Sequence, residues 1–300
     1  MGAMGAKRRL RVLGTVAAMG ALVLSGGPWI AVASAAAPTA YTCSGGSLVP
    51  AANPADPPTV TYAEIPSGTY SSIAVTGVCD IAPGAVINVL GNFAVAAGAI
   101  FDAQGAPAMI TVGRNFTGTS GSIFALGCLP NPPGHTTGHP CGSDLVGNPI
   151  DGVDPDTASS DVTINGNVVA TDSNVGLMYG VTVKGNVVLS GGGGPFPIPW
   201  AVKDNSIGGN LVVSNMTPNW FGLIRNHISG NAILTNVNIT DALFGDGTPT
   251  IFIASNTVDH NLICSGLGPA VSRGFGSEHN TVGHQTIGQC VNLPAFIPGG

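Results

Sequence analysis

The chain has 300 residues, of which 45 are glycine and only 8% are charged, and its formal net charge is −6. The charged fraction lies far below the usual quarter of a globular protein, so disorder driven by charge is excluded. The glycines follow no Gly-X-Y period, which excludes collagen, and the few charges leave no basic field for nucleic acid.

Residues 1–35 are predicted to be a signal peptide. Basic residues at positions 7–11 precede an apolar run over residues 12–24, which is too short to span a bilayer comfortably. The small residues 33–35 fit a cleavage site, so the mature chain is expected to be exported. An uncleaved anchor is the alternative. No later stretch is long enough for a transmembrane helix, so no membrane span is expected in the mature chain.

Six cysteines follow this segment, and an even number in an exported chain implies disulfide bonds. Sequence alone does not select among the alternative pairings. Pairing of nearest neighbours is favoured because each bridge then spans one coil or one loop. The expected bridges are Cys43–Cys79, Cys128–Cys141 and Cys264–Cys290. No Cys/His spacing typical of zinc is present.

Residues 36–61 are rich in proline and alanine and are predicted to form an extended entry and cap. A solenoid needs such a cover because an exposed strand edge invites aggregation. Coils are predicted over residues 62–290, and residues 291–300 form a Pro/Gly tail. Two surface loops are predicted to interrupt the coils, near residues 127–160 and 191–199.

A period of 23 residues (114 − 91) runs through the first predicted coils. Gly91-Asn92-Phe93 matches Arg114-Asn115-Phe116, and Phe101 matches Phe124 at the same shift. The matched phenylalanines are therefore expected to stack inside the core, Phe93 on Phe116 and Phe101 on Phe124.

One phrase recurs four times between residues 205 and 285. It reads Asn-x-Ile/Val-x-Gly/His-Asn/Gln, and its copies start at Asn205, Asn226, Asn256 and Asn280. The starts lie 21, 30 and 24 residues apart (226 − 205, 256 − 226, 280 − 256). A fixed phrase at this period indicates a repeat architecture. Most of the intervals are too short for a strand–helix–strand unit, which needs about 30 residues.

The runs that follow the phrases contain alternating apolar and β-branched residues, which predicts strands. The expected fold is all-β: a single-stranded right-handed parallel β-helix, or solenoid. Matching residues of successive coils then lie about 4.8 Å apart, so asparagines at a corner form a side-chain ladder. Ligand binding by the same residues is the alternative. The predicted ladder residues are Asn205, Asn210, Asn226, Asn231, Asn256, Asn261 and Asn280, of which Asn210, Asn231 and Asn261 are expected to point inward.

The chain resembles right-handed parallel β-helix proteins of the pectin-lyase-like superfamily, and more closely a group of secreted bacterial β-helix proteins. The resemblance covers about residues 41–290. It implies the fold and a bacterial, secreted or cell-surface location, and it implies no activity. The residues that carry it are the Cys43…Cys79 pair, Pro83-Gly-Ala85 with Gly98-Ala99, Leu126-Gly-Cys128, the Asn-x-Ile/Val-x-Gly-Asn coils and Gly288-Gln-Cys290.

Pectin-active members of that superfamily imply two enzyme classes, hydrolases and lyases. The hydrolase motifs Gly-His-Gly and Arg-x-Lys are absent, and no convincing pair of carboxylates on neighbouring coils is identified. Alignment of the repeats still places one set of candidate catalytic residues along one edge: Asp204, Arg225, His227, Asp259, His260, His279 and His284. The alternative is an exposed Asp204–Arg225 ion pair, worth about 0–1 kcal/mol, beside solvated histidines.

Three aspartates of the first loop, Asp151, Asp154 and Asp156, offer oxygen ligands to Ca²⁺. They lack the EF-hand pattern, so a solvated turn is the alternative. No other cofactor is expected.

These features together favour a secreted or cell-surface β-helix protein with a structural, adhesive or glycan-binding role. Its expected partner is an extracellular polysaccharide or a cell-wall component. A polysaccharide lyase or a glycoside hydrolase is the alternative function.

Overall fold

The structure is a computed structural model, and it describes residues 37–50, 58–130, 139–194, 198, 200–240, 249–274 and 279–296. The predicted signal peptide and the end of the predicted tail lie outside these residues. Parts of the predicted cap and of both predicted loops also lie outside them.

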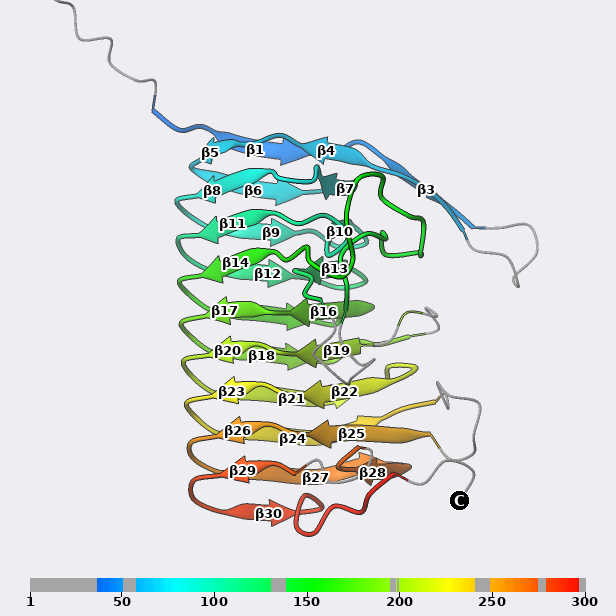
Figure 1. Ribbon diagram of the computed structural model, residues 1–300, viewed down its shortest axis with the longest axis vertical. Coiled ribbons are helices and arrows are strands. Elements are labelled where there is room, and N and C mark those ends of the chain that lie inside the picture. Colours follow the sequence, from blue (N-terminus) through cyan, green and yellow to red (C-terminus); the bar gives the residue numbers. More distant parts are fainter. Residues whose placement is uncertain are drawn as a thin grey trace, which may run out of the picture. The chain divides into compact units, whose positions relative to one another are not determined.

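Each coil of the chain contributes one strand to each of three parallel sheets, which we call A, B and C, and the coils stack one on the next (Figure 1). Sheet A has the order β1 (Ala40–Cys43), β6 (Ser72–Val75), β9 (Phe93–Val95), β12 (Phe116–Gly118), β15 (Val168–Thr171), β18 (Val187–Ser190), β21 (Leu211–Met216), β24 (Ala232–Asn238), β27 (Leu262–Gly268) and β30 (Thr286–Gly288). Sheet B has the order β4 (Ala63–Ile65), β7 (Val78–Ile81), β10 (Ile100–Ala103), β13 (Ile123–Leu126), β16 (Val175–Tyr179), β19 (Trp200–Lys203), β22 (Phe221–Ile224), β25 (Thr250–Ala254) and β28 (Ala270–Ser272). Sheet C has the order β5 (Gly68–Tyr70), β8 (Val86–Val89), β11 (Met109–Val112), β14 (Asp161–Ile164), β17 (Val181–Val183), β20 (Ser206–Ile207), β23 (His227–Ile228), β26 (Thr257–Val258) and β29 (Thr281–Val282).

This arrangement confirms the predicted all-β parallel β-helix. Every strand pair within the three sheets is parallel, and successive coils pair residue against residue. No helix occurs in the described residues, and none of them forms a helix that could cross a membrane.

The first coil begins earlier than the predicted boundary at residue 62. Strand β1 lies in the predicted cap, yet it pairs with β6 in sheet A, with Ala40 opposite Ser72. The reason is that burial alternates along Ala40–Cys43, with Cys43 buried, so the segment pairs like any later strand. The rest of the cap includes an antiparallel hairpin of β2 (Ser47–Val49) and β3 (Thr59–Thr61).

The interior is filled by matching residues of successive coils. Phe93 lies opposite Phe116 in sheet A, and Phe101 lies opposite Phe124 in sheet B, as the 23-residue period predicted. The Phe93 and Phe116 rings stack with centroids 5.2 Å apart, and all four rings are buried. Burial of each aromatic side chain contributes on the order of 1.5–3 kcal/mol.

Three disulfide bonds join the nearest-neighbour cysteines. Cys43 bonds to Cys79, Cys128 to Cys141 and Cys264 to Cys290, and no cysteine remains free. The first and last bridges lie near the two ends of the described solenoid, and the middle one closes the long loop after β13.

Candidate functional site

A buried asparagine ladder runs along the corner between sheets B and C. The first three asparagines each donate from the backbone N and from Nδ2 to Oδ1 of the asparagine on the following coil, at 2.9–3.0 Å. Each Nδ2 also donates to a backbone carbonyl, as Asn226 does to Val202 at 2.9 Å. The chain thereby satisfies the polar groups of a sharp buried turn, where an unpaired group costs about 1–3 kcal/mol. The members are Asn205, Asn226, Asn256 and Asn280.

A second ladder runs along the corner between sheets C and A, and its hydrogen bonds point the opposite way. Asn210, for example, donates from its backbone N (2.8 Å) and from Nδ2 (3.2 Å) to Oδ1 of Asn186 on the preceding coil. Asn210, Asn231 and Asn261 bond to one another, as expected, but they are half-buried rather than turned fully inward. The set that starts each phrase is buried at Asn205, Asn226 and Asn256, and partly exposed at Asn280. The second ladder contains Asn115, Asn167, Asn186, Asn210, Asn231 and Asn261.

The glycine of the phrase makes room for this second ladder. A Cβ added at Gly209 or Gly230 would lie 2.5–2.6 Å from Oδ1 of the asparagine on the preceding coil. His260 takes the position of that glycine in a later coil. The backbone N to Oδ1 distance is 2.8 Å at Asn231, behind a glycine, and 3.2 Å at Asn261, behind His260. Glycine therefore accompanies the shorter backbone bond, while the Nδ2 bond is alike in the two coils, 3.0 Å at Asn231 and 2.9 Å at Asn261.

The exterior of sheet A beside this ladder carries a column of aliphatic side chains. They lie in register across five strands, from β15 to β27, and all are partly exposed. Ile287 extends the column on β30 and is 41% exposed. The five in-register members are Val169, Val188, Val212, Ile233 and Ile263.

A column of hydroxyl groups lies two residues further along each of the same strands. Its side chains are partly or fully exposed, and none of them has a hydrogen-bond partner in the described part of the chain. The members are Thr171, Ser190, Ser214, Thr235 and Ser265.

Each of the five coils thus presents Asn, then Val or Ile, then Ser or Thr, at every second residue. We call these three columns the sheet A face. Alternate residues of a strand share one side of a sheet, and strands lie about 4.8 Å apart, so the face is a regular array without a charged side chain in its columns. This face was not predicted from the sequence, although the pattern Asn-x-Val/Ile-x-Ser/Thr recurs from Asn167 to Ser265.

The candidate catalytic pair Asp204 and Arg225 is bidentate and partly buried. Arg225 donates from Nε and Nη2 to the two carboxylate oxygens at 2.7 Å, and the side chains are 19% and 15% exposed for Asp204 and Arg225. Both residues adopt left-handed φ angles, 58° and 54°. Such a conformation costs a non-glycine residue roughly 1–2 kcal/mol, which the ion pair and the adjacent ladder offset.

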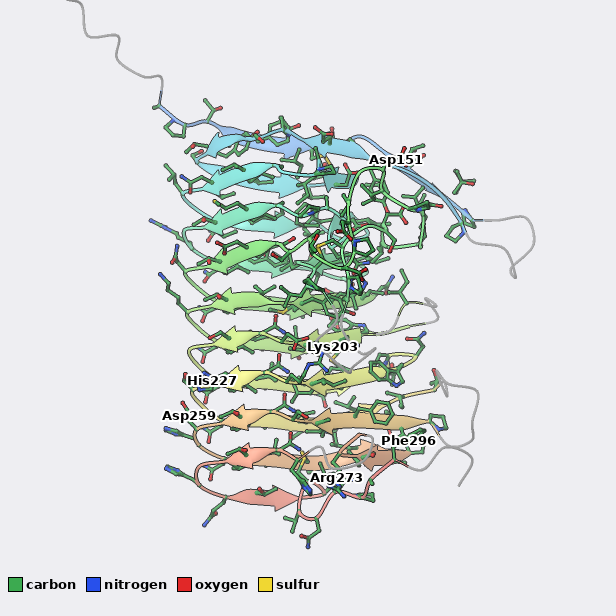
Figure 2. All side chains as sticks on the ribbon, in the orientation of Figure 1. Asp151, Lys203, His227, Asp259, Arg273 and Phe296 are labelled. Atoms are coloured by element: carbon green, nitrogen blue, oxygen red, sulfur yellow. A yellow bond between two sulfur atoms is a disulfide. The ribbon has the colours of Figure 1, made fainter. Side chains whose placement is uncertain are left out.

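The histidines do not converge on this pair. His227 lies on the exterior of sheet C, with Nε2 3.1 Å from Oδ1 of Asp259, and both side chains are exposed (Figure 2). His260 and His284 stack at the corner between sheets C and A, with ring centroids 4.9 Å apart.

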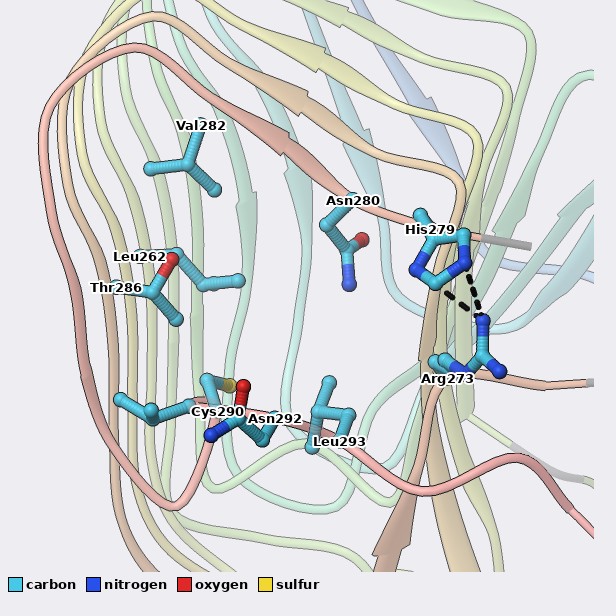
Figure 3. A pocket seen from close by; sticks show the side chains of 10 residues that line it. Leu262, Arg273, His279, Asn280, Val282, Thr286, Cys290, Asn292 and Leu293 are labelled. Atoms are coloured by element: carbon cyan, nitrogen blue, oxygen red, sulfur yellow. Dashed lines mark hydrogen bonds between the residues drawn. The ribbon is translucent and has the colours of Figure 1, made fainter. Parts of the chain in front are cut away.

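His279 lies at the corner between sheets B and C, as Asp204 and Arg225 do, but it contacts a different residue. Its ring accepts a hydrogen bond from Nη1 of Arg273, 3.1 Å from Nδ1 (Figure 3). The candidate catalytic residues therefore occupy two corners and the sheet between them, rather than the single predicted edge.

Lys203 lies beside Asp204, over two aromatic rings. Its Nζ is 5.7 Å from the Tyr179 ring centroid and 5.6 Å from that of Trp220. Burial, reinforced by Arg225 and opposed by Asp204, lowers the pKa of Lys203 to about 8. His139 stacks on Tyr179 at 4.3 Å, and burial, followed by Lys203, lowers its pKa to about 4. Because both aromatic rings are buried, this cluster is a packed support for the corner.

A column of carboxylates in sheet B was also not predicted from the sequence. Glu64, Asp80 and Asp102 lie in register on three successive strands of sheet B, so neighbouring coils do carry paired carboxylates. Burial raises the pKa of Asp102 to about 6, and burial together with Glu64 raises that of Asp80 to about 6. The signal was the spacing of 22 residues (102 − 80), close to one coil.

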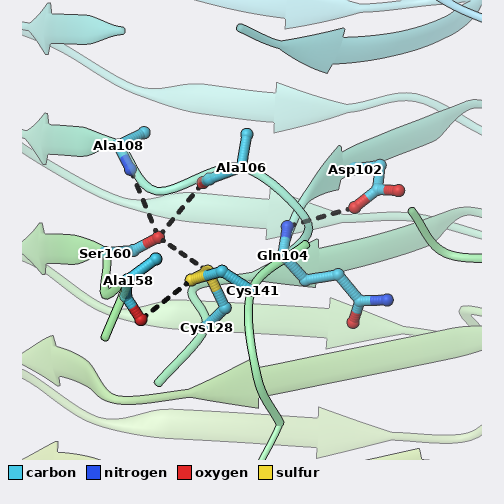
Figure 4. The surroundings of a disulfide bond; sticks show 8 residues. All are labelled: Asp102, Gln104, Ala106, Ala108, Cys128, Cys141, Ala158 and Ser160. Atoms are coloured by element: carbon cyan, nitrogen blue, oxygen red, sulfur yellow. Dashed lines mark hydrogen bonds between the residues drawn. A yellow bond between two sulfur atoms is a disulfide. The ribbon is translucent and has the colours of Figure 1, made fainter. Parts of the chain in front are cut away.

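The long loop after β13 covers Asp102, the last carboxylate of this column. Asp102 accepts hydrogen bonds from the backbone N–H of Leu145 at 2.6 Å and of Gln104 at 3.1 Å, the latter drawn in Figure 4. Tyr62 donates its hydroxyl to the same carboxylate at 3.3 Å. Asp102 is 4% exposed, and its hydrogen bonds attach the long loop to sheet B.

The predicted calcium ligands form a turn in the same loop. Asp154 accepts from the Thr157 hydroxyl at 2.8 Å and from the backbone N–H of Asp156 at 3.0 Å, which lowers the pKa of Asp154. Among the described residues, no group of three or more His, Cys, Asp or Glu is arranged to hold a metal ion.

The fold and this face define the class of the protein: a parallel β-helix solenoid with a regular, uncharged exterior face on sheet A. A scan against protein-family models and searches of curated proteins and of solved structures found no match to this chain.

Proposed function

We propose that this protein is a secreted or cell-surface bacterial β-helix, related to the pectin-lyase-like solenoids, that binds a neutral extracellular polysaccharide in a structural or adhesive role. The observation that carries the proposal is the sheet A face, in which amide, aliphatic and hydroxyl side chains repeat in register over five coils.

The chemistry of the face fits a flat, uncharged polymer. A sugar ring offers apolar C–H faces and hydroxyl edges, and the aliphatic column removes the former from water while the flanking columns bond the latter. Each exposed Ser or Thr hydroxyl can donate and accept, and each ladder amide keeps one Nδ2 hydrogen that the ladder does not use. Apolar contact contributes about 25 cal/mol per Å² buried, so affinity grows with the number of coils engaged.

Export is consistent with the three disulfides. Such bonds persist in oxidising compartments and are rare in the cytosol. They support the proposed location together with the basic and apolar sequence of residues 1–35.

A pull-down on insoluble polysaccharides tests the proposal. We expect the disulfide-bonded protein to bind a neutral glycan such as cellulose or chitin, and the Ile233→Lys variant to lose most of that binding. The matched control is Thr182→Lys, which places the same charge on the exposed exterior of sheet C. Equal binding by both variants, or no binding to any neutral glycan, would contradict the proposal.

A second candidate, glycoside hydrolysis, is favoured by one observation. Asp80 and Asp102 lie on adjacent coils with pKa values of about 6, and paired carboxylates are the requirement for that chemistry. Coverage of Asp102 by the loop weighs against it. Release of reducing sugar by the native protein, abolished by Asp80→Asn, would favour this candidate over the binding role.

A further inference from the structure

The last described coil borders an open pocket of about 450 Å³ (Figure 3). Its size falls within the range of small-molecule sites, about 300–1,000 Å³. Leu262, Val282 and Leu293 give it apolar walls, and Asn280 points into it from β29's leading turn. Arg273 and His279 line one side.

Asn280 is the final described member of this ladder, and its backbone N–H and second Nδ2 hydrogen are donors that the ladder does not use. On the coil before it, Asn256 donates from its backbone N (3.0 Å) and Nδ2 (2.9 Å) to a single oxygen, Oδ1 of Asn280. Asn280 donates once, from Nδ2 to the carbonyl of Ile253 at 2.7 Å, as earlier members do. Among the described residues, the backbone N–H of Asn280 has no hydrogen-bond acceptor at the next ladder position. The repeat itself therefore specifies what fits there: one oxygen atom held by two N–H groups.

The charge at the cavity selects the kind of oxygen. Arg273 is the one formally charged residue among those that line it, and its Nη1 lies 3.1 Å from Nδ1 of His279. A guanidinium favours a carboxylate over an uncharged carbonyl, because hydrogen bonds between ionised groups are about twice as strong as neutral ones.

We propose that this cavity binds a small amphipathic carboxylate. One carboxylate oxygen takes the next ladder position on the backbone N–H and Nδ2 of Asn280, and the charge faces Arg273. The apolar body lies against Leu262, Val282 and Leu293. This site shares no lining residue with the sheet A face and does not depend on the polysaccharide proposal.

Isothermal titration calorimetry of the disulfide-bonded protein with octanoate tests this site. We expect saturable one-to-one binding, and about tenfold weaker binding of octanol, which has the same apolar body without the charge. Arg273→Gln weakens octanoate binding about tenfold, while Arg114→Gln, on an exposed arginine of an early coil, leaves it unchanged. Asn280→Asp retains the oxygen that Asn256 needs and adds a like charge, so it also weakens binding.

Circular dichroism melting of each variant identifies any that has lost its fold, and Arg273→Gln removes no ladder bond. The proposal is overturned by absence of saturable octanoate binding, by equal affinity for octanoate and octanol, or by an unchanged affinity of a folded Arg273→Gln protein. Ile233→Lys, on the sheet A face, leaves octanoate affinity unchanged, which separates this site from the polysaccharide-binding role.

Discussion

Oδ1 of Asn256 accepts two hydrogen bonds from Asn226 on the preceding coil, from the backbone N at 3.0 Å and from Nδ2 at 2.9 Å. Asn226 in turn receives the same pair from Asn205. One amide side chain therefore links three coils, while the half-buried ladder at the next corner runs the other way. The two ladders differ in burial, so they differ in what a lost amide costs.

Replacement of Asn226 by leucine is expected to lower the free energy of unfolding by roughly 3 kcal/mol or more, because it strands buried partners on both neighbouring coils. Asn231→Leu, in the half-buried ladder, is expected to cost about 1–2 kcal/mol. Urea unfolding followed by circular dichroism measures both.

The control for these two variants must be an exposed asparagine. Asn219 is unsuitable, because it is only 8% exposed and its Oδ1 accepts a hydrogen bond from the backbone N–H of Trp220. Asn238 is exposed on the outer side of β24, and Asn238→Leu should change stability by less than about 0.5 kcal/mol. Equal losses for Asn226→Leu and Asn238→Leu would refute the buried ladder.

Addition of a methyl group at Gly230 is expected to destabilise the protein by about 1–3 kcal/mol. The new Cβ would lie 2.6 Å from Oδ1 of Asn210 and 2.7 Å from the Gly209 carbonyl oxygen. His260→Ala, at the equivalent position one coil later, should be nearly neutral because a Cβ is already accommodated there. Thermal melting compares the two, and a harmless Gly230→Ala would contradict the packing argument.

The carboxylate column predicts a pH dependence of stability. The unfolded chain loses the Asp80 proton near pH 4, whereas the folded protein loses it near pH 6, because burial and Glu64 raise its pKa. Between these values the folded state holds more protons, so the contribution of Asp80 is full below about pH 4 and is lost as the pH rises through 6. Asp80→Asn should therefore raise the free energy of unfolding relative to wild type, and this gain should be larger at pH 7 than at pH 4, by about 1 kcal/mol after solvent screening.

Melting temperatures of Asp80→Asn and wild type across pH 4–7 check this. The difference between the two proteins is the informative quantity. His139, whose pKa is lowered to about 4, makes a contribution to stability that is lost as the pH falls, whereas that of Asp80 is lost as the pH rises. The His139 contribution is common to both proteins and cancels in the difference. A constant difference across this pH range would contradict the raised pKa of Asp80.

Removal of the Cys128–Cys141 bridge is expected to loosen the long loop without unfolding the solenoid. The bridge closes 13 residues of sequence separation, and a loop of that length is worth roughly 3 kcal/mol in the unfolded chain. In a Cys128→Ala, Cys141→Ala protein, limited proteolysis should cut within residues 139–160 while the far-UV spectrum stays β-rich. Simultaneous loss of that spectrum would show that the loop holds the coils together.

The fold was predictable because its signal is repeated. Each copy of the Asn-x-Ile/Val-x-Gly/His phrase adds independent support for a coil, and the matched phenylalanines gave the register of the early coils. Which amide faces inward was not predictable from the phrase, because Asn226 and Asn231 stand at both ends of the same copy. Their burial is decided by the left-handed turn at Arg225, which directs the first amide into the core.

The candidate site was harder to predict because it depends on which side of a strand faces outward. Val212 lies between buried Leu211 and Val213, and in sequence the three are equally apolar. Only the register across β18, β21 and β24 shows that Val188, Val212 and Ile233 share the exterior. The carboxylates Asp80 and Asp102 were missed for a different reason: their spacing of 22 residues differs by one from the 23-residue period of the phenylalanines.

The most direct test of the polysaccharide-binding account is carbene footprinting, read by mass spectrometry, of the protein with and without a bound neutral glycan. The account predicts protection concentrated on the exterior residues of sheet A, with Val212 and Ile233 at its centre, and unchanged labelling of Met109 and Val86 on the exterior of sheet C. Protection centred on sheet B or C, with sheet A labelled as in the free protein, would contradict it.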